Sequence, residues 1–308
     1  MKTLVVASGK GGAGKTTISA LFAIFASQDS SVVVVDCDVE ASNLPLALGA
    51  EITSRELFGG GEKAEVDVSL CAGCGDCLAN CRFDAIAITA SGSASVDPWR
   101  CEGCGVCATV CPFGAIKLEP QRAGHLYVGR SVTGPIVFGR LDPGHDLSGK
   151  LVSTARERAE RLAKDTHADF ILVDGPPGIG CPVIASITGA YGILAVTEPT
   201  LSGEHDLLRL IELSRQMRIP IKVALNKSDL SSFGADRIRE TCQREGLELI
   251  GEIPFDEGLA SEMSRLAEGG ELVLDMTGVS GLSTIRSLWD RVGTWISEWE
   301  ESPARTLG

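Results

Sequence analysis

The strongest chemical signal in the sequence is a glycine-rich stretch near its start, residues 8–17. From Gly9 it fits the pattern G-x-x-x-x-G-K-[ST], in which backbone N–H groups surround phosphate oxygens. In such a loop Lys15 reaches the outer phosphates of a nucleotide, and the Thr16 hydroxyl is a ligand for Mg²⁺. The stretch therefore predicts a binding site for a nucleoside triphosphate and its magnesium ion.

A second signal is an internal repeat that contains eight of the eleven cysteines. The spacing C-x₂-C-x₂-C-x₃-C occurs at residues 71–81 and again at 101–111. This is the bacterial run for 4Fe–4S clusters, in which the fourth cysteine of each run ligates the other cluster. Zinc sites favour two C-x-x-C pairs with a longer gap, and structural disulfides are rare in the cytosol. We therefore assign one cluster to Cys71, Cys74, Cys77 and Cys111, and the other to Cys101, Cys104, Cys107 and Cys81.

The cysteine-rich segment resembles the two-cluster bacterial ferredoxins over roughly residues 66–120. Each run is followed by a similar tail, residues 83–86 and 113–116. The first repeat departs from the ferredoxins at Arg82, where they usually carry proline. This departure affects the expected conformation of the loop and the expected potential of one cluster, and it leaves the ligand set unchanged. The resemblance implies an α+β bacterial-type ferredoxin domain at residues 62–122.

The elements that must position the phosphate loop follow a strand–helix alternation. Residues 31–36 and 170–174 contain unbroken apolar runs with no polar alternation and end in Asp36 and Asp174, which is typical of strands buried on both faces of a parallel sheet. Further strands are predicted at 125–130, 135–138, 191–197, 219–225 and 247–253, and helices at 15–28, 148–164, 203–217, 235–245, 258–268 and 281–299. The alternation predicts an α/β fold with a doubly wound, mostly parallel sheet.

Composition changes near Gly59, Gly60 and Gly61, and α/β patterning resumes near Gly124. We therefore expect one discontinuous domain, residues 1–61 and 123–308, that is interrupted after its second strand by the ferredoxin domain. Residues 40–48 are expected to form a loop with a short helix.

The phosphate loop holds a second lysine, Lys10, in the run K-G-G-A-G-K-T. With the segments 36–38, 174–178 and 196–200, the chain resembles the deviant-phosphate-loop ATPases of the MinD, Mrp and nitrogenase iron-protein superfamily. The resemblance covers essentially the whole chain outside the insert. The combined architecture looks like the MinD-superfamily ATPases that carry an inserted ferredoxin domain.

This resemblance implies a slow, partner-stimulated ATPase that dimerises around ATP. Lys10 would reach the nucleotide of the other subunit, Asp38 would position the attacking water, and Asp174 would hold the water shell of the metal. The implied catalytic group is Lys10, Lys15, Asp38 and Asp174, with Mg²⁺ at Thr16, Asp38 and Asp174. The implied nucleotide contacts are Gly11, Gly12, Ala13, Gly14, Lys15, Thr16, Thr17, Gly178, Asn226, Pro254 and Phe255.

The identity of the base depends on residues 226–229, Asn-Lys-Ser-Asp. This tetrad resembles the guanine-reading motif of GTPases. In the resembled ATPase family the same asparagine reads adenine, so ATP is favoured over GTP. Pro254 and Phe255 are expected to form the opposite wall of the base pocket.

The bulk properties exclude several classes of function. The formal charge of −13 argues against broad nucleic-acid binding. The sequence contains no run of 18 uncharged apolar residues, so no membrane span is predicted. The start of the chain lacks a signal peptide's regions, so a cytoplasmic protein is expected. The last predicted helix has an acidic polar face, which favours packing onto the sheet over membrane binding.

Three functions are compatible with these expectations. In the first, a nucleotide-dependent homodimer gates electron transfer through two 4Fe–4S clusters to or from a redox protein partner. The second is iron–sulfur cluster assembly or carriage of the Mrp type, although those relatives use a C-terminal C-x-x-C pair that this chain lacks after Cys111. The third is MinD-like spatial positioning, with a structural ferredoxin module. We favour the first, because the insert follows directly on the first predicted switch, residues 38–48.

Overall fold

The structure is a computed structural model that describes residues 1–259, 261, 265 and 280–299. The helix predicted at 258–268 lies largely outside these residues. The chain divides into two compact units. The first comprises Met1–Glu56, His125–Leu141 and Asp146–Gly308, and the second comprises Leu57–Gly124 and Asp142–His145.

The first unit is built on a nine-stranded sheet with the order β11-β10-β9-β1-β8-β2-β7-β6-β3. The strands are β1 Lys2–Ser8, β2 Val32–Asp36, β3 Glu51–Val66, β6 Ile116–Ser131, β7 Gly134–Leu141, β8 Phe170–Pro177, β9 Gly192–Thr197, β10 Ile221–Asn226 and β11 Leu249–Ile253. From β11 to β7 the neighbouring strands are parallel. The mostly parallel α/β sheet predicted from the sequence is therefore confirmed.

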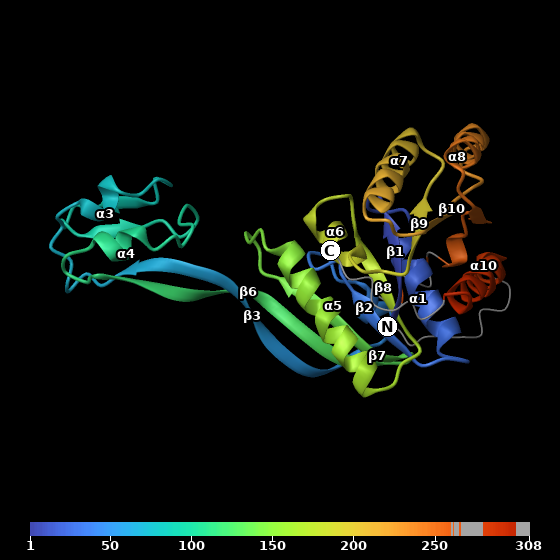
Figure 1. Ribbon diagram of the computed structural model, residues 1–308, viewed down its shortest axis with the longest axis horizontal. Helices are drawn as coiled ribbons and strands as arrows, with labels where there is room; N and C mark the ends of the chain where they lie inside the picture. Colours follow the sequence, from blue (N-terminus) through green and yellow to red (C-terminus); the bar gives the residue numbers. More distant parts are fainter. Residues whose placement is uncertain (260, 262–264, 266–279, 300–308) are drawn as a thin grey trace. The chain divides into compact units, whose positions relative to one another are not determined.

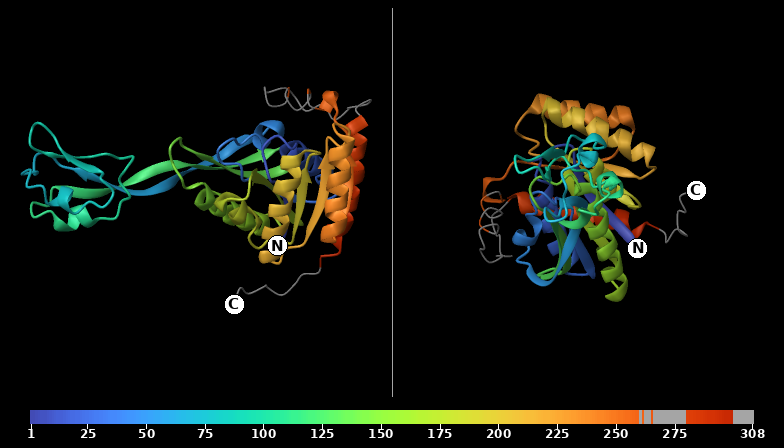
Figure 2. Two further views of the ribbon diagram at one scale, coloured as in Figure 1. Left: turned by 90° about the horizontal axis from the view of Figure 1, so that it is seen from above. Right: turned by 90° about the vertical axis from the view of Figure 1, so that its left-hand side faces the viewer.

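Helices cover both faces of this sheet (Figure 1). They are α1 Lys15–Ala26, α2 Leu44–Ala47, α5 Ser148–Asp165, α6 Cys181–Ile187, α7 Leu201–Gln216, α8 Ser232–Glu245 and α10 Ser280–Ser297. The helices α1 and α10 pack together on one face, and α5 packs against α6 on the other. The helices α7 and α8 pair beside β9 and β10 (Figures 1 and 2).

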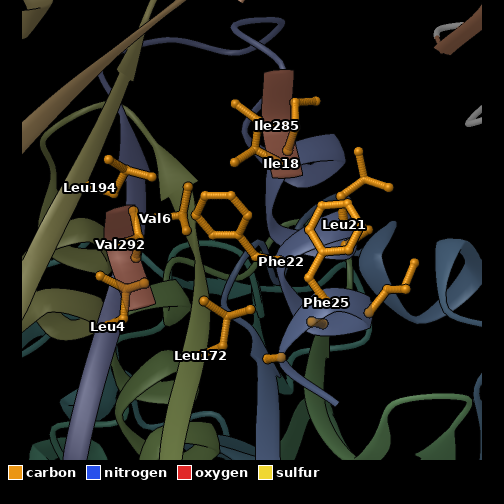
Figure 3. Close-up of a cluster of buried hydrophobic side chains, with 14 of the residues drawn as sticks. Leu4, Val6, Ile18, Leu21, Phe22, Phe25, Leu172, Leu194, Ile285 and Val292 are labelled. Atoms are coloured by element: carbon orange, nitrogen blue, oxygen red, sulfur yellow. The ribbon is translucent and has the colours of Figure 1, made fainter. Parts of the chain in front are cut away.

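The last helix is part of the core. Ile285 and Val292 of α10 are buried and lie with Phe22 of α1 and Leu4 of β1 in one apolar cluster (Figure 3). The packing onto the sheet that the sequence predicts is therefore confirmed. No helix within the described residues is both long enough and apolar enough to span a membrane.

The glycine-rich segment at 59–61 lies close to the start of the second unit at Leu57, but it does not form a turn or a linker. It lies inside the long strand β3, which neighbours β6 at the edge of the sheet. Three consecutive glycines are typical of a turn. Here Gly60 allows β3 to lie close to Ala123 of β6, because an added Cβ at Gly60 would lie 2.9 Å from the Ala123 Cβ. The chain thus adds a third strand to the sheet before it enters the cysteine-rich segment.

The second unit contains the eight clustered cysteines and little regular structure. It holds α3 Asp76–Ala79, α4 Val106–Val110, and an antiparallel pair formed by β4 Ile86–Ile88 and β5 Ala94–Val96. Its bounds are wider than residues 62–122, and it includes the separate segment Asp142–His145. No composition change marks that segment in the sequence.

Candidate functional site

The phosphate loop occupies the turn between β1 and α1. Gly14 precedes α1 with φ 85°, and no side chain caps the first turn of this helix. Acidic residues are also missing from that turn. The N–H groups and the positive dipole end of a twelve-residue helix are therefore available to an anion at this position.

A buried carboxylate, Asp174, joins the predicted phosphate-binding residues. The Thr16 hydroxyl donates to Asp174 Oδ2 at 2.7 Å, and the Ser19 hydroxyl donates to Oδ1 at 2.8 Å. Lys15 Nζ lies 3.4 Å from the same Oδ1, and this lysine is itself buried. The structure thus brings together Lys15, Thr16 and Asp174, which the sequence assigned to one magnesium and phosphate site.

Asp36 is a site residue that the sequence reasoning missed. It is in register with Asp174 on the neighbouring strand, so two buried carboxylates lie side by side. It accepts hydrogen bonds from the Asp38 N–H (2.9 Å), the Ser42 hydroxyl (2.8 Å) and the Leu44 N–H (3.1 Å). Burial, together with the negative charge of Asp174, raises the pKa of Asp36 to about 7. Its place as the last residue of a fully buried strand was the available signal.

Asp38 lies in the segment that Asp36 holds. Its carboxylate accepts a hydrogen bond from the Ala41 N–H at 3.2 Å, while its own N–H donates to Asp36. Both of these hydrogen bonds are local, within residues 36–41. Asp38 is linked to the Lys15 and Thr16 network only through Asp36, whose strand neighbour is Asp174.

Lys10, the second lysine of the loop, is engaged by Glu198. Its Nζ lies 2.5 Å from Glu198 Oε1 and donates to the Ser202 hydroxyl at 3.1 Å. Glu198 also lies 3.4 Å from Lys227 Nζ, which donates to Gly12 O at 2.8 Å. Burial alone would raise the pKa of Glu198, but the hydrogen bond and charge of Lys10, with the charge of Lys227, lower it. The segment 196–200 was part of the family resemblance, yet no role had been assigned to Glu198.

The predicted base-reading residues lie beside the loop. Asn226 Nδ2 donates to Ala13 O at 2.9 Å, so this side chain supports the phosphate loop. The Phe255 N–H donates to Asp229 Oδ1 at 2.7 Å, which brings the segment after β11 against the segment after β10. Gly178 donates its N–H to Ser8 O at 3.1 Å. The candidate nucleotide residues, which come from the ends of β1, β8, β10 and β11, therefore gather at the carboxyl edge of the sheet, where α/β proteins bind ligands.

The second unit contains two small cavities that open to solvent. Each is lined by four cysteines, three from one run and one from the other. Cys101, Cys104, Cys107 and Cys81 line the larger, and Cys71, Cys74, Cys77 and Cys111 line the smaller. Three of these sulfurs accept backbone N–H bonds: Cys71 from Ala94 (3.3 Å), Cys111 from Ala115 (3.4 Å) and Cys101 from Ala64 (3.5 Å).

The two runs have matching surroundings. The first and fourth cysteines of each run are half-buried, the second are exposed, and the third are buried. The Asp67 N–H donates to Ala115 O, and the Asp97 N–H donates to Ala85 O in the equivalent place. Among the described residues, no three His, Cys, Asp or Glu side chains converge on a point where one metal ion could bind. A 4Fe–4S cube differs from such an ion, because each thiolate binds a different iron.

The raised pKa of Asp36 predicts a pH-dependent stability. Between about pH 4 and pH 7 the folded state binds a proton here more tightly than the unfolded chain does. The ionisation of Asp36 should therefore lower the free energy of unfolding as pH rises through this window, and Asp36→Asn should remove this contribution. Denaturant unfolding of the nucleotide-free protein at several pH values measures it.

The exposed Asp165 provides the matched control, because Asp165→Asn should leave the pH dependence as in the wild type. An Asp36→Asn protein that loses stability with rising pH as steeply as the wild type would contradict the assignment.

Comparison with known proteins agrees with this site. The sequence profile of the family described as the CobQ/CobB/MinD/ParA nucleotide binding domain matches residues 4–267. A relative named uncharacterized protein MJ0578, from Methanocaldococcus jannaschii, is 36% identical over 236 residues, which cover 75% of this chain and 79% of that protein. The iron-sulfur cluster carrier protein of Rickettsia bellii is 24% identical and aligns with 84% of this chain and 63% of its own length.

Among solved structures, the cell division ATPase MinD of Pyrococcus furiosus superposes with a TM-score of 0.56. The two chains are 19% identical, and the match covers 96% of this chain and 99% of that one, so it supports the fold. The profile match spans the phosphate loop, both buried aspartates and Asn226. The chain therefore belongs to the CobQ/CobB/MinD/ParA family and is a P-loop ATPase of the MinD superfamily.

Proposed function

We propose that the protein is an ATP-hydrolysing iron–sulfur protein whose ATP-dependent homodimer gates electron transfer through two 4Fe–4S clusters. The observation that carries the proposal is the pair of cavities, each lined by four cysteines contributed by both runs. The partner is a one-electron redox protein. The proposal includes a cytosolic location, because unpaired cysteines are typical of reducing compartments.

The residues around the cavities fit such clusters. Thiolates are the usual ligands of 4Fe–4S clusters, and backbone N–H groups aimed at sulfur set the reduction potential. The exposed Cys74 and Cys104 would bring an edge of each cluster near solvent, where a partner could approach. When bound, each cluster supplies a site that takes one electron from a reduced protein and passes it to an oxidised one.

The first unit supplies the nucleotide chemistry. Lys15 would hold the outer phosphates of ATP, and the Thr16 hydroxyl would hold Mg²⁺, which supplies positive charge that offsets the charge of the phosphates. Asp174 would hold the water shell of the metal. Asp38 is carried by the segment 38–44 that Asp36 holds, so a change at Asp174 reaches Asp38 through the neighbouring carboxylate.

Gating requires that the nucleotide state reach the cysteine-rich unit. Residues 38–48 lead into β3, and β3 runs directly into that unit. Lys10 would exchange its bond to Glu198 for the nucleotide of the second subunit, so dimerisation and release of Glu198 occur together. This exchange supports the assignment of a homodimer.

A second candidate function is delivery of iron–sulfur clusters. It is favoured by the relative named iron-sulfur cluster carrier protein, which matches most of this chain. Four cysteine ligands per cavity favour retention over release, so we rank it second. Rapid ATP-dependent transfer of clusters to an apo-ferredoxin would reverse the ranking. A third candidate function is MinD-like spatial positioning, in which the second unit has a structural role. It would be favoured if no physiological reductant could reduce the clusters.

The ligand assignment predicts the iron content of a single variant. After anaerobic reconstitution the wild-type chain should hold about eight iron atoms, and Cys74→Ser should hold about four, because one cluster loses a ligand. Iron and sulfide determination with electron paramagnetic resonance measures both. Cys181→Ser is the control, since this exposed cysteine lies outside both cavities and should leave the content unchanged. A wild-type chain that binds one zinc ion instead would refute the proposal.

The role of Lys10 predicts a variant that binds nucleotide but stays monomeric. Sedimentation velocity with a non-hydrolysable ATP analogue should show a dimer for the wild type and a monomer for Lys10→Ala. The exposed lysine of α5, Lys164, supplies the control, and Lys164→Ala should dimerise normally. If Lys10→Ala dimerises as the wild type does, Lys10 has no role across the interface.

A further inference from the structure

We propose that residues 142–149 form a mechanical link that transmits the nucleotide state of residues 178–181 to the turn that carries Cys101. This inference rests on the proposed function, because it names the route by which the ATPase site acts on the cysteine-rich unit. The link has one contact point in each unit, at Trp99 and at Gly149, and the chain itself connects the two.

The contact in the second unit joins Trp99 to Gly144. An added Cβ at Gly144 would lie 2.3 Å from Trp99 Cζ3, so the indole ring rests directly on this backbone. Gly144 has φ 85°, a conformation that other residues rarely adopt. The segment 142–145 is also fixed by the Asp142 N–H, which donates to Ala123 O at 2.7 Å, and by the ion pair of Asp142 with Arg122 at 2.8 Å.

Trp99 is part of the turn that delivers Cys101. The Trp99 N–H donates to Asp97 Oδ1 at 2.9 Å, and the Cys101 N–H donates to Asp97 O at 3.0 Å. A displacement of the indole ring therefore acts on a tight turn that ends at a cysteine of the larger cavity. The equivalent position in the first repeat is Ser69. Its turn has the same hydrogen bonds, because the Ser69 N–H donates to Asp67 Oδ1 and the Cys71 N–H donates to Asp67 O. The fold thus does not require tryptophan here, and its side chain remains 73% exposed.

The contact in the first unit joins α5 to α6. Gly149 lies in the first turn of α5, and an added Cβ would lie 3.2 Å from the Cys181 Cβ. Cys181 is the first residue of α6 and follows Gly178, whose N–H is bonded to Ser8 at the end of β1. A nucleotide phosphate that binds the Gly178 N–H would replace its bond to Ser8 and would displace the start of α6 against the start of α5.

A buried arginine makes these two helices move together. Arg156 of α5 donates to Ser186 O at 2.8 Å and to Ala185 O at 3.4 Å, and it also donates to Thr188 O. These carbonyl groups lie at the end of α6, so the guanidinium fastens that end of the helix to α5. A tightly packed pair of this kind shifts as a body rather than deforming. The displacement then passes along residues 145–148 to Gly144 and Trp99.

Hydrogen exchange of the reconstituted full-length protein tests the link. We compare peptides covering 97–101 and 142–149 without nucleotide and with a non-hydrolysable ATP analogue, in the wild type and in Trp99→Ala. The wild type should show a nucleotide-dependent change in both segments. Trp99→Ala should lose the change in 97–101 and keep it in 142–149, with the same iron content and ATPase rate. Trp99→Phe retains a ring over Gly144 and should restore the change.

Each other outcome overturns a defined claim. A nucleotide-dependent change at 97–101 that survives in Trp99→Ala would refute the link, as would a wild-type segment 142–149 that ignores nucleotide. The proposed function fails separately, because it also requires a nucleotide-dependent cluster potential in the wild type. If the cluster potential shifts with nucleotide while hydrogen exchange in 97–101 and 142–149 stays unchanged, only the proposed link is refuted.

Discussion

The site is organised by the packing of two buried carboxylates against one buried lysine. Asp36 and Asp174 end adjacent parallel strands in direct register, and Lys15 lies 3.4 Å from Asp174. One ammonium group cannot neutralise two charges, so burial and the charge of Asp174 together raise the pKa of Asp36. The proposed switch depends on this arrangement, because a bound magnesium ion and the phosphates of a nucleotide would change the charge around both carboxylates.

Both segments that leave this pair of aspartates lead out of the site. Residues 38–44 depend on Asp36 and continue toward β3, while residues 175–180 follow Asp174 and start α6. The ends of these two routes reach the second unit through β3 and through the segment 142–149. A change in charge at Lys15 thus has two routes to the second unit, one along the chain through β3 and one through the packing of α6 against α5. This layout is the basis of the proposed control of the second unit by the phosphate loop.

Local patterns predicted the parts of the structure that depend on local chemistry. Glycine and lysine spacing located the phosphate loop, unbroken apolar runs located the buried strands, and cysteine spacing grouped the cysteines as the two cavities group them. The sequence could not show β3, whose exposed residues and three glycines lack strand periodicity. Glu198 and Trp99 were also missed, because their roles depend on partners distant in the chain. Asp36 gained its role only from register with Asp174.

The central claim is that nucleotide binding alters the clusters. The most direct measurement is a redox titration followed by electron paramagnetic resonance, on the reconstituted protein with and without ATP. The account predicts that ATP shifts the midpoint potential of at least one cluster by on the order of 60 mV, which is a tenfold change in a one-electron equilibrium. Lys15→Ala should abolish the shift. The account would be contradicted if the midpoint potential of each cluster were the same with and without ATP, in the wild type as in Lys15→Ala.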